Sequence, residues 1–163
     1  MKFVISLFLL GPLQLTAQGC HLIKGADPIT SKPTLTTGFI DLPGCTLSID
    51  ANNKEIDFFF VMSNPILKCL DENTSATVIF DGGKLKGEYK NGGSMNCNGI
   101  FHIIFKNSLY TPSPLQRLAA KKIITIRLKG SSEKPFDINL PPELQKTLMD
   151  LIGCVITESK PLL

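Results

Sequence analysis

The sequence contains no tryptophan, and only two histidines and two tyrosines among its 163 residues. Neither sign of charge dominates, since 17 lysines and arginines are set against 14 aspartates and glutamates, for a formal net charge of +3. Because basic and acidic residues are nearly equal in number, a nucleic acid is not expected as partner. His21 and His102 are the only imidazole bases, and His21 lies in a segment with no regular pattern. We expect His102 to be a hydrogen-bonded core or rim residue.

Most signatures of catalysis are also missing. The five cysteines include no C-x-x-C pair of the kind that binds zinc, and no cluster of acidic residues is spaced for calcium. There is no G-x-S-x-G motif, and neither Gly82-Gly83 nor Gly92-Gly93 precedes a helix with a phosphate-binding lysine. Cys97 and His102 lie five apart on one predicted strand, hence on opposite faces. We therefore expect no enzyme, no catalytic residue, no metal and no cofactor.

The single long apolar run lies at the N-terminus. A basic start, Met1-Lys2, is followed by an apolar block at 3–10, a Gly11-Pro12 break and small residues up to Ala17, in the order typical of an export signal. The block is shorter than the roughly 20 residues of a membrane-spanning helix. We predict that residues 1–17 are a signal peptide and that the protein is secreted or periplasmic.

An exported chain meets an oxidising environment, in which cysteines form disulfides. Five cysteines are an odd number, so at least one has another role. Cys20 follows Ala17-Gln18-Gly19, the position at which a bacterial lipoprotein carries its lipidated cysteine. A lipid on Cys20 is the one membrane attachment that we consider. The alternative to lipidation is ordinary cleavage of the signal peptide near Ala17. The remaining disulfide candidates are Cys45, Cys69, Cys97 and Cys154, and the favoured bond joins Cys69 to Cys97, on segments expected to be neighbours in a sheet.

The rest of the chain predicts a flexible tether followed by one domain. Residues 18–34 contain turn-forming glycine and proline without periodicity and are assigned to the tether. Residues 35–158 are assigned to a single α+β domain. Short apolar or alternating segments between turn residues predict strands at 36–42, 46–50, 56–62, 66–70, 76–80, 84–90, 95–105, 123–129 and 136–140.

Two helices are predicted. Ser113, Pro114 and Gln116 form the pattern of a capping box and begin a short helix that ends near Lys121-Lys122. A longer helix follows Pro141-Pro142, with an apolar stripe typical of packing on a sheet. The fold class is therefore α+β, a largely antiparallel β-sheet with one short helix before the last hairpin and a C-terminal amphipathic helix packed on the sheet. Within that hairpin, Arg127 is expected to meet Asp137 as a surface pair.

Several segments resemble a family of exported proteins. They are the signal-like start, the strand 76–80 with its Asp81-Gly82-Gly83 turn, Asn96-Cys97-Asn98-Gly99, and the block 118–128, which ends in Ile123-Ile124-Thr125-Ile126-Arg127-Leu128. Together they are similar to uncharacterised periplasmic or surface proteins of Bacteroidota-type bacteria. The resemblance covers roughly residues 55–156, its motifs are structural, and it implies no activity and no functional residue.

The function expected from these observations is noncatalytic. We expect an exported envelope or secreted protein that binds a protein or envelope component, or gives structural support, through the face or edge of a sheet. Two alternatives remain open. One is a small exported hydrolase with a carboxylate site, because two carboxylates acting on a glycosidic bond leave no sequence motif. The other is a secreted inhibitor or effector with a rigid protruding loop, at 91–94 or 110–112.

Overall fold

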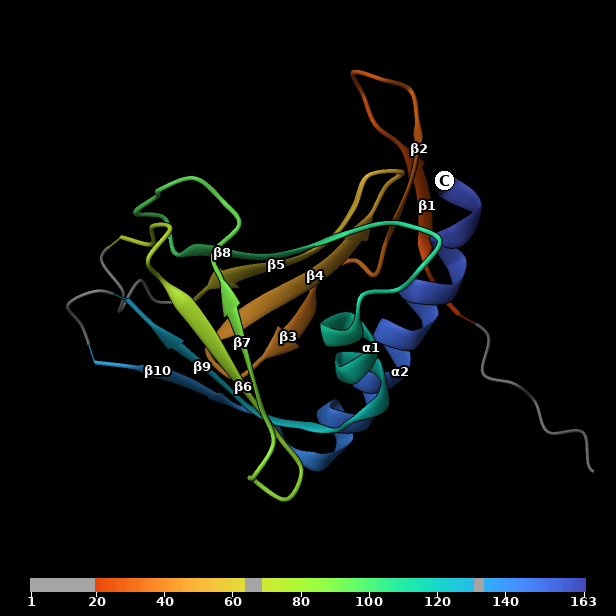
Figure 1. The fold of residues 1–163 in the computed structure, drawn as a ribbon. Helices are drawn as coiled ribbons and strands as arrows, with labels where there is room; N and C mark the ends of the chain where they lie inside the picture. The colour runs from red at the N-terminus through yellow and green to blue at the C-terminus, as the bar shows by residue number, and fades with distance from the viewer. Residues whose placement is uncertain (1–19, 64–68, 131–133) are drawn as a thin grey trace, which may run out of the picture.

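The computed structural model describes residues 20–63, 69–130 and 134–163. The predicted signal peptide and most of the predicted strand 66–70 lie outside these residues. The described chain forms two antiparallel β-sheets, one short helix and a longer C-terminal helix (Figure 1). The α+β fold class predicted from the sequence is thereby confirmed. The strands form two sheets, where the sequence pattern alone had suggested one.

The larger sheet contains six strands within the described residues, and we call it the six-stranded sheet. Its order is β1-β2-β4-β5-β8, with β3 also paired to β4. The strands are β1 (Ile23–Ala26), β2 (Pro33–Thr36), β3 (Ile40–Leu42), β4 (Cys45–Ala51), β5 (Glu55–Met62) and β8 (Ile100–Lys106). Strict alternation along β5 buries Ile56, Phe58 and Phe60 on one face and leaves Asp57 and Phe59 partly exposed on the other. This alternation fixes an inner and an outer face.

The second sheet, which we call the four-stranded sheet, has the order β10-β9-β6-β7 in the described chain. Its strands are β6 (Ser75–Phe80), β7 (Lys86–Lys90), β9 (Ile123–Lys129) and β10 (Phe136–Asn139). Gly82 and Gly83 have φ values of +80° and +68° in the turn after β6, a backbone conformation that glycine adopts without strain. Arg127 lies opposite Asp137 in the register of β9 and β10, which confirms the predicted pair.

Two helices cover the open side between the sheets (Figure 1). Helix α1 spans Ser113–Ala120, helix α2 spans Pro142–Glu158, and a short 3-10 helix follows at Lys160–Leu162. α2 packs against α1 and against β2, β4 and β9, burying Leu148, Ile152 and Val155 as its predicted apolar face requires. No helix in the described ranges is long and apolar enough to span a bilayer.

The start of α1 differs from the prediction. Pro112 occupies the N-cap position and no side chain caps the helix, so Ser113 and Gln116 form no capping box. The Gln116 amide instead donates a hydrogen bond to the carbonyl of Thr111. The proline at the second helical position still fits the expected pattern, because its missing N–H would have no partner there.

The prediction of a flexible tether at 18–34 was wrong. This segment contains β1 and the first two residues of β2, and these two strands form an antiparallel hairpin at the edge of the six-stranded sheet. The Asp27 carboxylate accepts hydrogen bonds from the backbone of Ile29 and Thr30 and so closes the turn. Leu35 is buried, and Cys20 is bonded to Cys154 in α2. The hairpin escaped prediction because every residue of β1 is exposed and leaves no hydrophobic pattern.

The inner faces of both sheets share one hydrophobic core with the helices. Fully buried residues come from each layer, among them Leu47 and Phe60 in the six-stranded sheet, Leu128 and Ile138 in the four-stranded sheet, and Ile152 in α2. Since both inner faces point toward this core, the two outer faces point away from each other (Figure 1). The helices cover neither outer face, although the segment at 91–94 lies over part of the six-stranded sheet, against His102 and Ile104.

Candidate functional site

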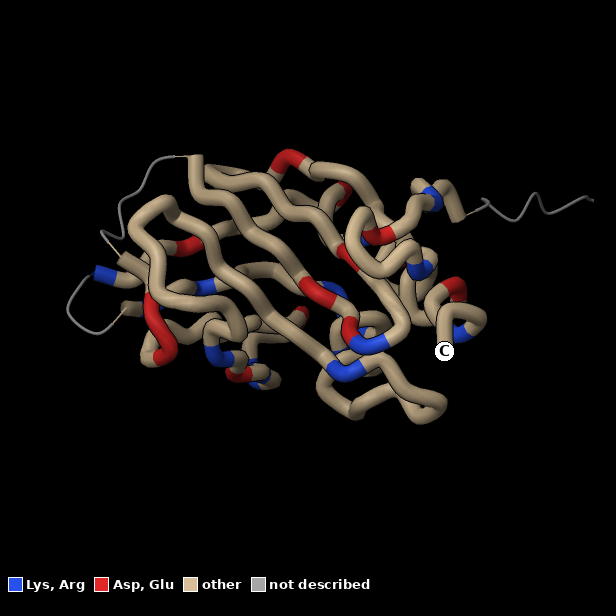
Figure 2. Tube along the Cα trace, turned by 90° about the horizontal axis from the view of Figure 1, so that it is seen from above, with Lys and Arg blue, Asp and Glu red and all other residues tan. Residues whose placement is uncertain are grey.

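The outer face of the six-stranded sheet combines acidic, hydroxyl-bearing, aromatic and imidazole side chains. By strand register, one row across it contains Thr36, Asp50, Asp57 and Ile104, and the next contains Ser48, Phe59 and His102. Figure 2 looks onto this face from above and shows acidic positions along its strands. Polar and aromatic side chains therefore meet here at the centre of a sheet.

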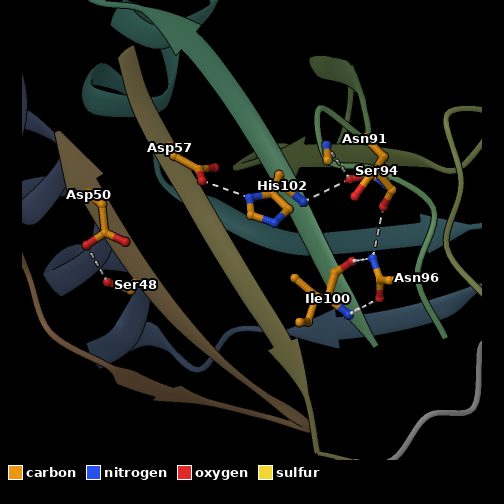
Figure 3. Close-up of polar contacts among 9 residues, drawn as sticks. Ser48, Asp50, Asp57, Asn91, Ser94, Asn96, Ile100 and His102 are labelled. Carbon is orange, nitrogen blue, oxygen red and sulfur yellow. Dashed lines mark hydrogen bonds and ion pairs between the residues drawn. The ribbon is translucent and has the colours of Figure 1, made fainter. Parts of the chain in front are cut away.

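The central contact joins Asp57 on β5 to His102 on β8. Asp57 Oδ2 lies 2.7 Å from His102 Nδ1 (Figure 3), and the two side chains are only 19% and 22% exposed. The other carboxylate oxygen, Oδ1, is buried and has no hydrogen-bond partner among the described residues. Burial raises the pKa of the Asp57 carboxyl above its ordinary value, and the hydrogen bond from His102 only partly opposes that rise. Desolvation thus outweighs the nearby ring.

His102 is enclosed by neighbours on two sides. The ring of Phe59 meets it edge-on with centroids 5.0 Å apart, and Phe39 extends this aromatic strip with its centroid 6.3 Å from that of Phe59. On the other side, a Cβ atom added to Gly93 would come within 2.5 Å of the His102 ring. Only glycine allows the backbone to approach the imidazole this closely. His102 thus lies at the rim of the sheet, hydrogen-bonded to a carboxylate.

Two asparagines take the place of a strand along the free edge of β8 (Figure 3). Asn91 Oδ1 accepts a hydrogen bond from the His102 backbone N–H at 3.0 Å, while the Gly92 N–H donates to the His102 carbonyl at 3.0 Å. Asn96 bonds both backbone groups of Ile100 through its side chain. The backbone groups of His102 and Ile100 are thus satisfied, so they are not available to pair with another strand.

The segment 91–99 therefore folds back along β8, and the loop 91–94 that we considered as an inhibitor loop lies against His102. The predicted strand 95–105 is also shorter than expected: β8 begins at Ile100, and Asn96 makes only an isolated bridge with Leu70. The other loop candidate, 110–112, carries the exposed Tyr110. Its neighbour Ser108 accepts a hydrogen bond from the Lys160 ammonium through its carbonyl oxygen.

A groove of about 310 Å³ adjoins the Asp57–His102 contact. Three carboxylates line it, those of Asp50, Glu55 and Asp57, together with the hydroxyls of Thr34 and Thr36. In the described chain, neither Asp50 nor Glu55 forms an ion pair with a lysine or arginine. The groove therefore has an excess of negative charge, which is complementary to a cationic partner.

Ser48 fixes the orientation of the carboxylate on β4. Its hydroxyl donates to Asp50 Oδ1 at 2.8 Å and lies 3.1 Å from the hydroxyl of Thr36 (Figure 3 shows the first of these). Asp50 stands directly opposite Asp57 in the register of β4 and β5. The site thus presents two neighbouring carboxylates, one held by a hydroxyl and the other by an imidazole.

The cysteines form two disulfides. Cys69 is bonded to Cys97, the pair favoured from the sequence, and this bond fixes the segment 91–99 beside β8. Cys20 is bonded to Cys154, and a sulfur atom in a disulfide cannot also carry a lipid. Cys45 remains as the buried free thiol, and burial raises its pKa to about 12. Two disulfides place the protein in an oxidising compartment outside the cytosol.

A larger hollow, of about 690 Å³, lies beside the Cys20–Cys154 bond and along α2. It includes His21 and one carboxylate, Asp150, whose side chain is exposed and paired with Lys146 at 2.5 Å. Within the residues that the structure describes, no group of three histidine, cysteine or acidic side chains is arranged to hold a metal ion. The outer face of the six-stranded sheet is therefore the better candidate site.

The residues found there were mostly missed in the sequence. His102 was singled out, but its partner Asp57 lies 45 positions away, and nothing local indicates which strand lies beside β8. Asp50 and Asp57 could have been paired, because they lie at nearly equal distances from the Asn52-Asn53-Lys54 turn, two residues before it and three after it. Comparison with protein-family models, with curated proteins and with solved structures found no match to this chain.

Proposed function

We propose that this protein is a noncatalytic exported protein, secreted or periplasmic, that binds a protein or an envelope component through the outer face of the six-stranded sheet. One observation carries the proposal: this face is left uncovered by the helices, yet it combines the aromatic strip of Phe39 and Phe59 with the carboxylates around Asp57. The resemblance to exported proteins of Bacteroidota-type bacteria agrees with such a role and is part of the proposal.

The composition of the face supports binding by an interface. Phe39, in the loop between β2 and β3, is 68% exposed beside Phe59, and Ile104 on β8 is 40% exposed on a sheet surface where a polar residue would be expected. Binding surfaces combine apolar and aromatic anchors with a polar rim, and exposed apolar patches on otherwise soluble domains commonly mark interaction sites. The hydrogen bonds among Thr36, Ser48 and Asp50 hold the polar part in place before any partner arrives, which lowers the entropic cost of binding.

Capture with matched variants tests the proposal. The mature, oxidised protein is immobilised and exposed to envelope extract of the cell that produces it, and retained components are identified by mass spectrometry. Phe39→Ser removes the exposed aromatic without touching the core. Ile29→Ser is the control, because Ile29 is 92% exposed in the β1–β2 turn, away from the face. We expect F39S to lose the captured component and I29S to keep it.

Equal capture by F39S, I29S and the unaltered protein would remove the outer face as the binding surface. Intact mass of the secreted product tests export at the same time. The mass should correspond to a chain cleaved near Ala17 without a lipid, and it should rise by four hydrogens on reduction of the two disulfides. A lipid on Cys20 would contradict the Cys20–Cys154 bond.

A specific observation also favours the hydrolase alternative. Asp50 and Asp57 are directly opposed on neighbouring strands, a spacing that brings Cβ atoms to about 5 Å, and carboxyl groups roughly 5 Å apart are used by retaining glycosidases. The raised pKa of Asp57 suits a proton donor. Asp57→Asn should then abolish hydrolysis of a chromogenic glycoside series, whereas a chain without activity on any member supports the noncatalytic function.

A further inference from the structure

The outer face of the four-stranded sheet has the opposite charge. Its outward positions carry Lys86 and Lys90 on β7, and Arg127 and Lys129 on β9, all of them exposed. Two carboxylates share this face, Glu88 and Asp137. Asp137 is paired with Arg127, and Glu88 accepts a hydrogen bond from Thr77. The three lysines have no ion-pair partner in the described chain, so this face is basic.

The outer face of the six-stranded sheet is acidic by the same accounting. Its outward positions carry Asp41, Asp50, Glu55 and Asp57 against the single lysine Lys106, and in the described chain only Asp57 has an ion-pair partner, His102. The whole chain is nearly balanced, with a formal charge of +3, so charge is segregated between the two sides of the molecule. The two faces point away from each other on either side of the shared core (Figure 1).

We propose that the partner of the six-stranded sheet is the four-stranded sheet of a second copy of this chain. This inference rests on the proposed function and names its partner. The lysines of one copy meet the carboxylates of the next, and their aliphatic stems cover the aromatic strip, with the ammonium groups placed to contact Phe39 and Phe59. Complementary potentials of this kind fix orientation and speed association.

The contact is head to tail, because it joins two different surfaces. Each copy that uses its acidic face keeps its basic face free on the opposite side, and such a heterologous contact propagates into chains unless a rotation closes a ring. Asn91 and Asn96 already bond the backbone of His102 and Ile100 at the free edge of β8, and the complementary charges lie on the faces of the two sheets. The contact is therefore one of face on face, without added strands.

Sedimentation velocity of the mature, oxidised protein tests self-association. We expect species larger than a monomer at low ionic strength, and at least about a tenfold fall in the association constant between roughly 50 and 500 mM salt, because exposed charges are screened over that range. A monomer at every concentration and ionic strength overturns the inference, and so does an assembly that salt leaves unchanged.

Two charge-reversal variants make the test specific. The first variant, Lys86→Glu with Lys129→Glu, reverses two charges on the basic face. The second variant, Asp41→Lys with Glu55→Lys, reverses two charges on the acidic face. None of these four side chains makes a hydrogen bond within the described residues, so both variants should fold, and circular dichroism checks this. Each variant alone should be monomeric. Mixed together they should form a one-to-one complex, because each supplies the face that the other has lost.

Variants that assemble alone as the unaltered protein does, or a mixture that stays monomeric, overturn the inference. Should the reversals disturb folding, the neutral pair Lys86→Gln and Lys129→Gln replaces the first variant and should weaken association several-fold. The proposed function fails separately. If the unaltered protein remains monomeric but F39S no longer retains the captured component, the outer face of the six-stranded sheet is still the binding surface. Only the inference that a second copy binds there is then overturned.

Discussion

Two carboxylates in this molecule have a nitrogen partner at the same distance and yet differ in acidity. Asp57 lies 2.7 Å from His102 on the six-stranded sheet, and Asp137 lies 2.7 Å from Arg127 on the four-stranded sheet. The pKa of Asp57 is raised, mainly by burial, whereas the hydrogen bond from Arg127 lowers the pKa of Asp137. Contact distance alone therefore does not predict the direction in which the pKa of a carboxyl group is shifted.

The difference follows from what surrounds each pair. Phe59 and Gly93 enclose the imidazole, and one oxygen of Asp57 is buried without a partner. The Arg127 guanidinium instead makes two hydrogen bonds to Asp137 in a pair that is open to water. A bidentate partner with permanent charge stabilises a carboxylate, whereas partial burial destabilises it. The first arrangement is typical of binding sites, and the second of an ordinary sheet surface.

Removing the Cys69–Cys97 bond should have the largest effect. Replacing both cysteines by serine releases a loop of 28 residues, for which chain entropy predicts a loss of about 3.5 kcal/mol in the free energy of unfolding. The same change frees the segment 91–99 that covers His102. Urea unfolding measures the loss, and hydrogen exchange should show faster exchange at the His102 amide with little change at Arg127. Equal change at both amides would mean that the disulfide does not act on the buried pair in particular.

Removing the imidazole should have the next largest effect. His102→Ala leaves the Asp57 carboxyl partly buried without its partner, and we expect a loss of about 1–3 kcal/mol at neutral pH. Asp137→Ala serves as the matched control on the other sheet. Its cost should be well below that of His102→Ala, because an exposed pair contributes little. The free energy of unfolding is measured in urea for both variants. Similar losses would show that the Asp57–His102 pair contributes no more to stability than the exposed Arg127–Asp137 pair.

The hydroxyl network gives a smaller effect. Ser48→Ala removes a buried hydroxyl that donates to Asp50 and contacts Thr36, at an expected cost of about 1 kcal/mol. The control is Thr125→Val on β9, whose hydroxyl donates to Asn139 on the exposed side of the hairpin, and whose loss should stay within about 0.5 kcal/mol. A larger cost for T125V than for S48A would show that the polar residues of the six-stranded sheet are not a preformed network.

Much of the fold was predictable, because alternation records which side of a strand is buried. The strand 123–129, the hairpin with Asp137 and the terminal helix follow directly from local patterns that the structure keeps. In β1 no residue is buried, so the sequence there shows no alternation of apolar and polar residues from which a strand could be predicted. Turn residues such as Pro28 and Pro33 then suggested a linker, although they flank the loop of a hairpin.

The site was harder to predict, because it depends on which strands are neighbours. The contact of Asp57 with His102 requires β5 to pair with β8, across an intervening hairpin that belongs to the other sheet. No local signal carries that information. The role of Asn91 and Asn96 was hidden for a related reason, since side chains that imitate a strand leave no alternating pattern.

The smallest expected effect is the dependence of stability on pH. Its sign should differ between Asp57 and Asp137. A carboxyl whose pKa is raised by folding stabilises the native state most below the ordinary aspartate pKa of about 3.9, and that contribution is lost as pH rises through the folded value. This is the case of Asp57. A carboxyl whose pKa is lowered stabilises the native state above about 3.9, and the contribution is lost as pH falls through its folded value. This is the case of Asp137.

Asp57→Asn and Asp137→Asn each remove one of these contributions. The free energy of unfolding is measured in urea for both variants and the unaltered protein at intervals from about pH 3 to pH 7, a range that spans the ordinary aspartate value. The stability difference between the unaltered protein and D57N should shrink as pH rises, while the difference from D137N should grow. Two differences that change in the same direction would show that burial does not control the Asp57 carboxyl, since the attraction of its partner would then dominate on both sheets.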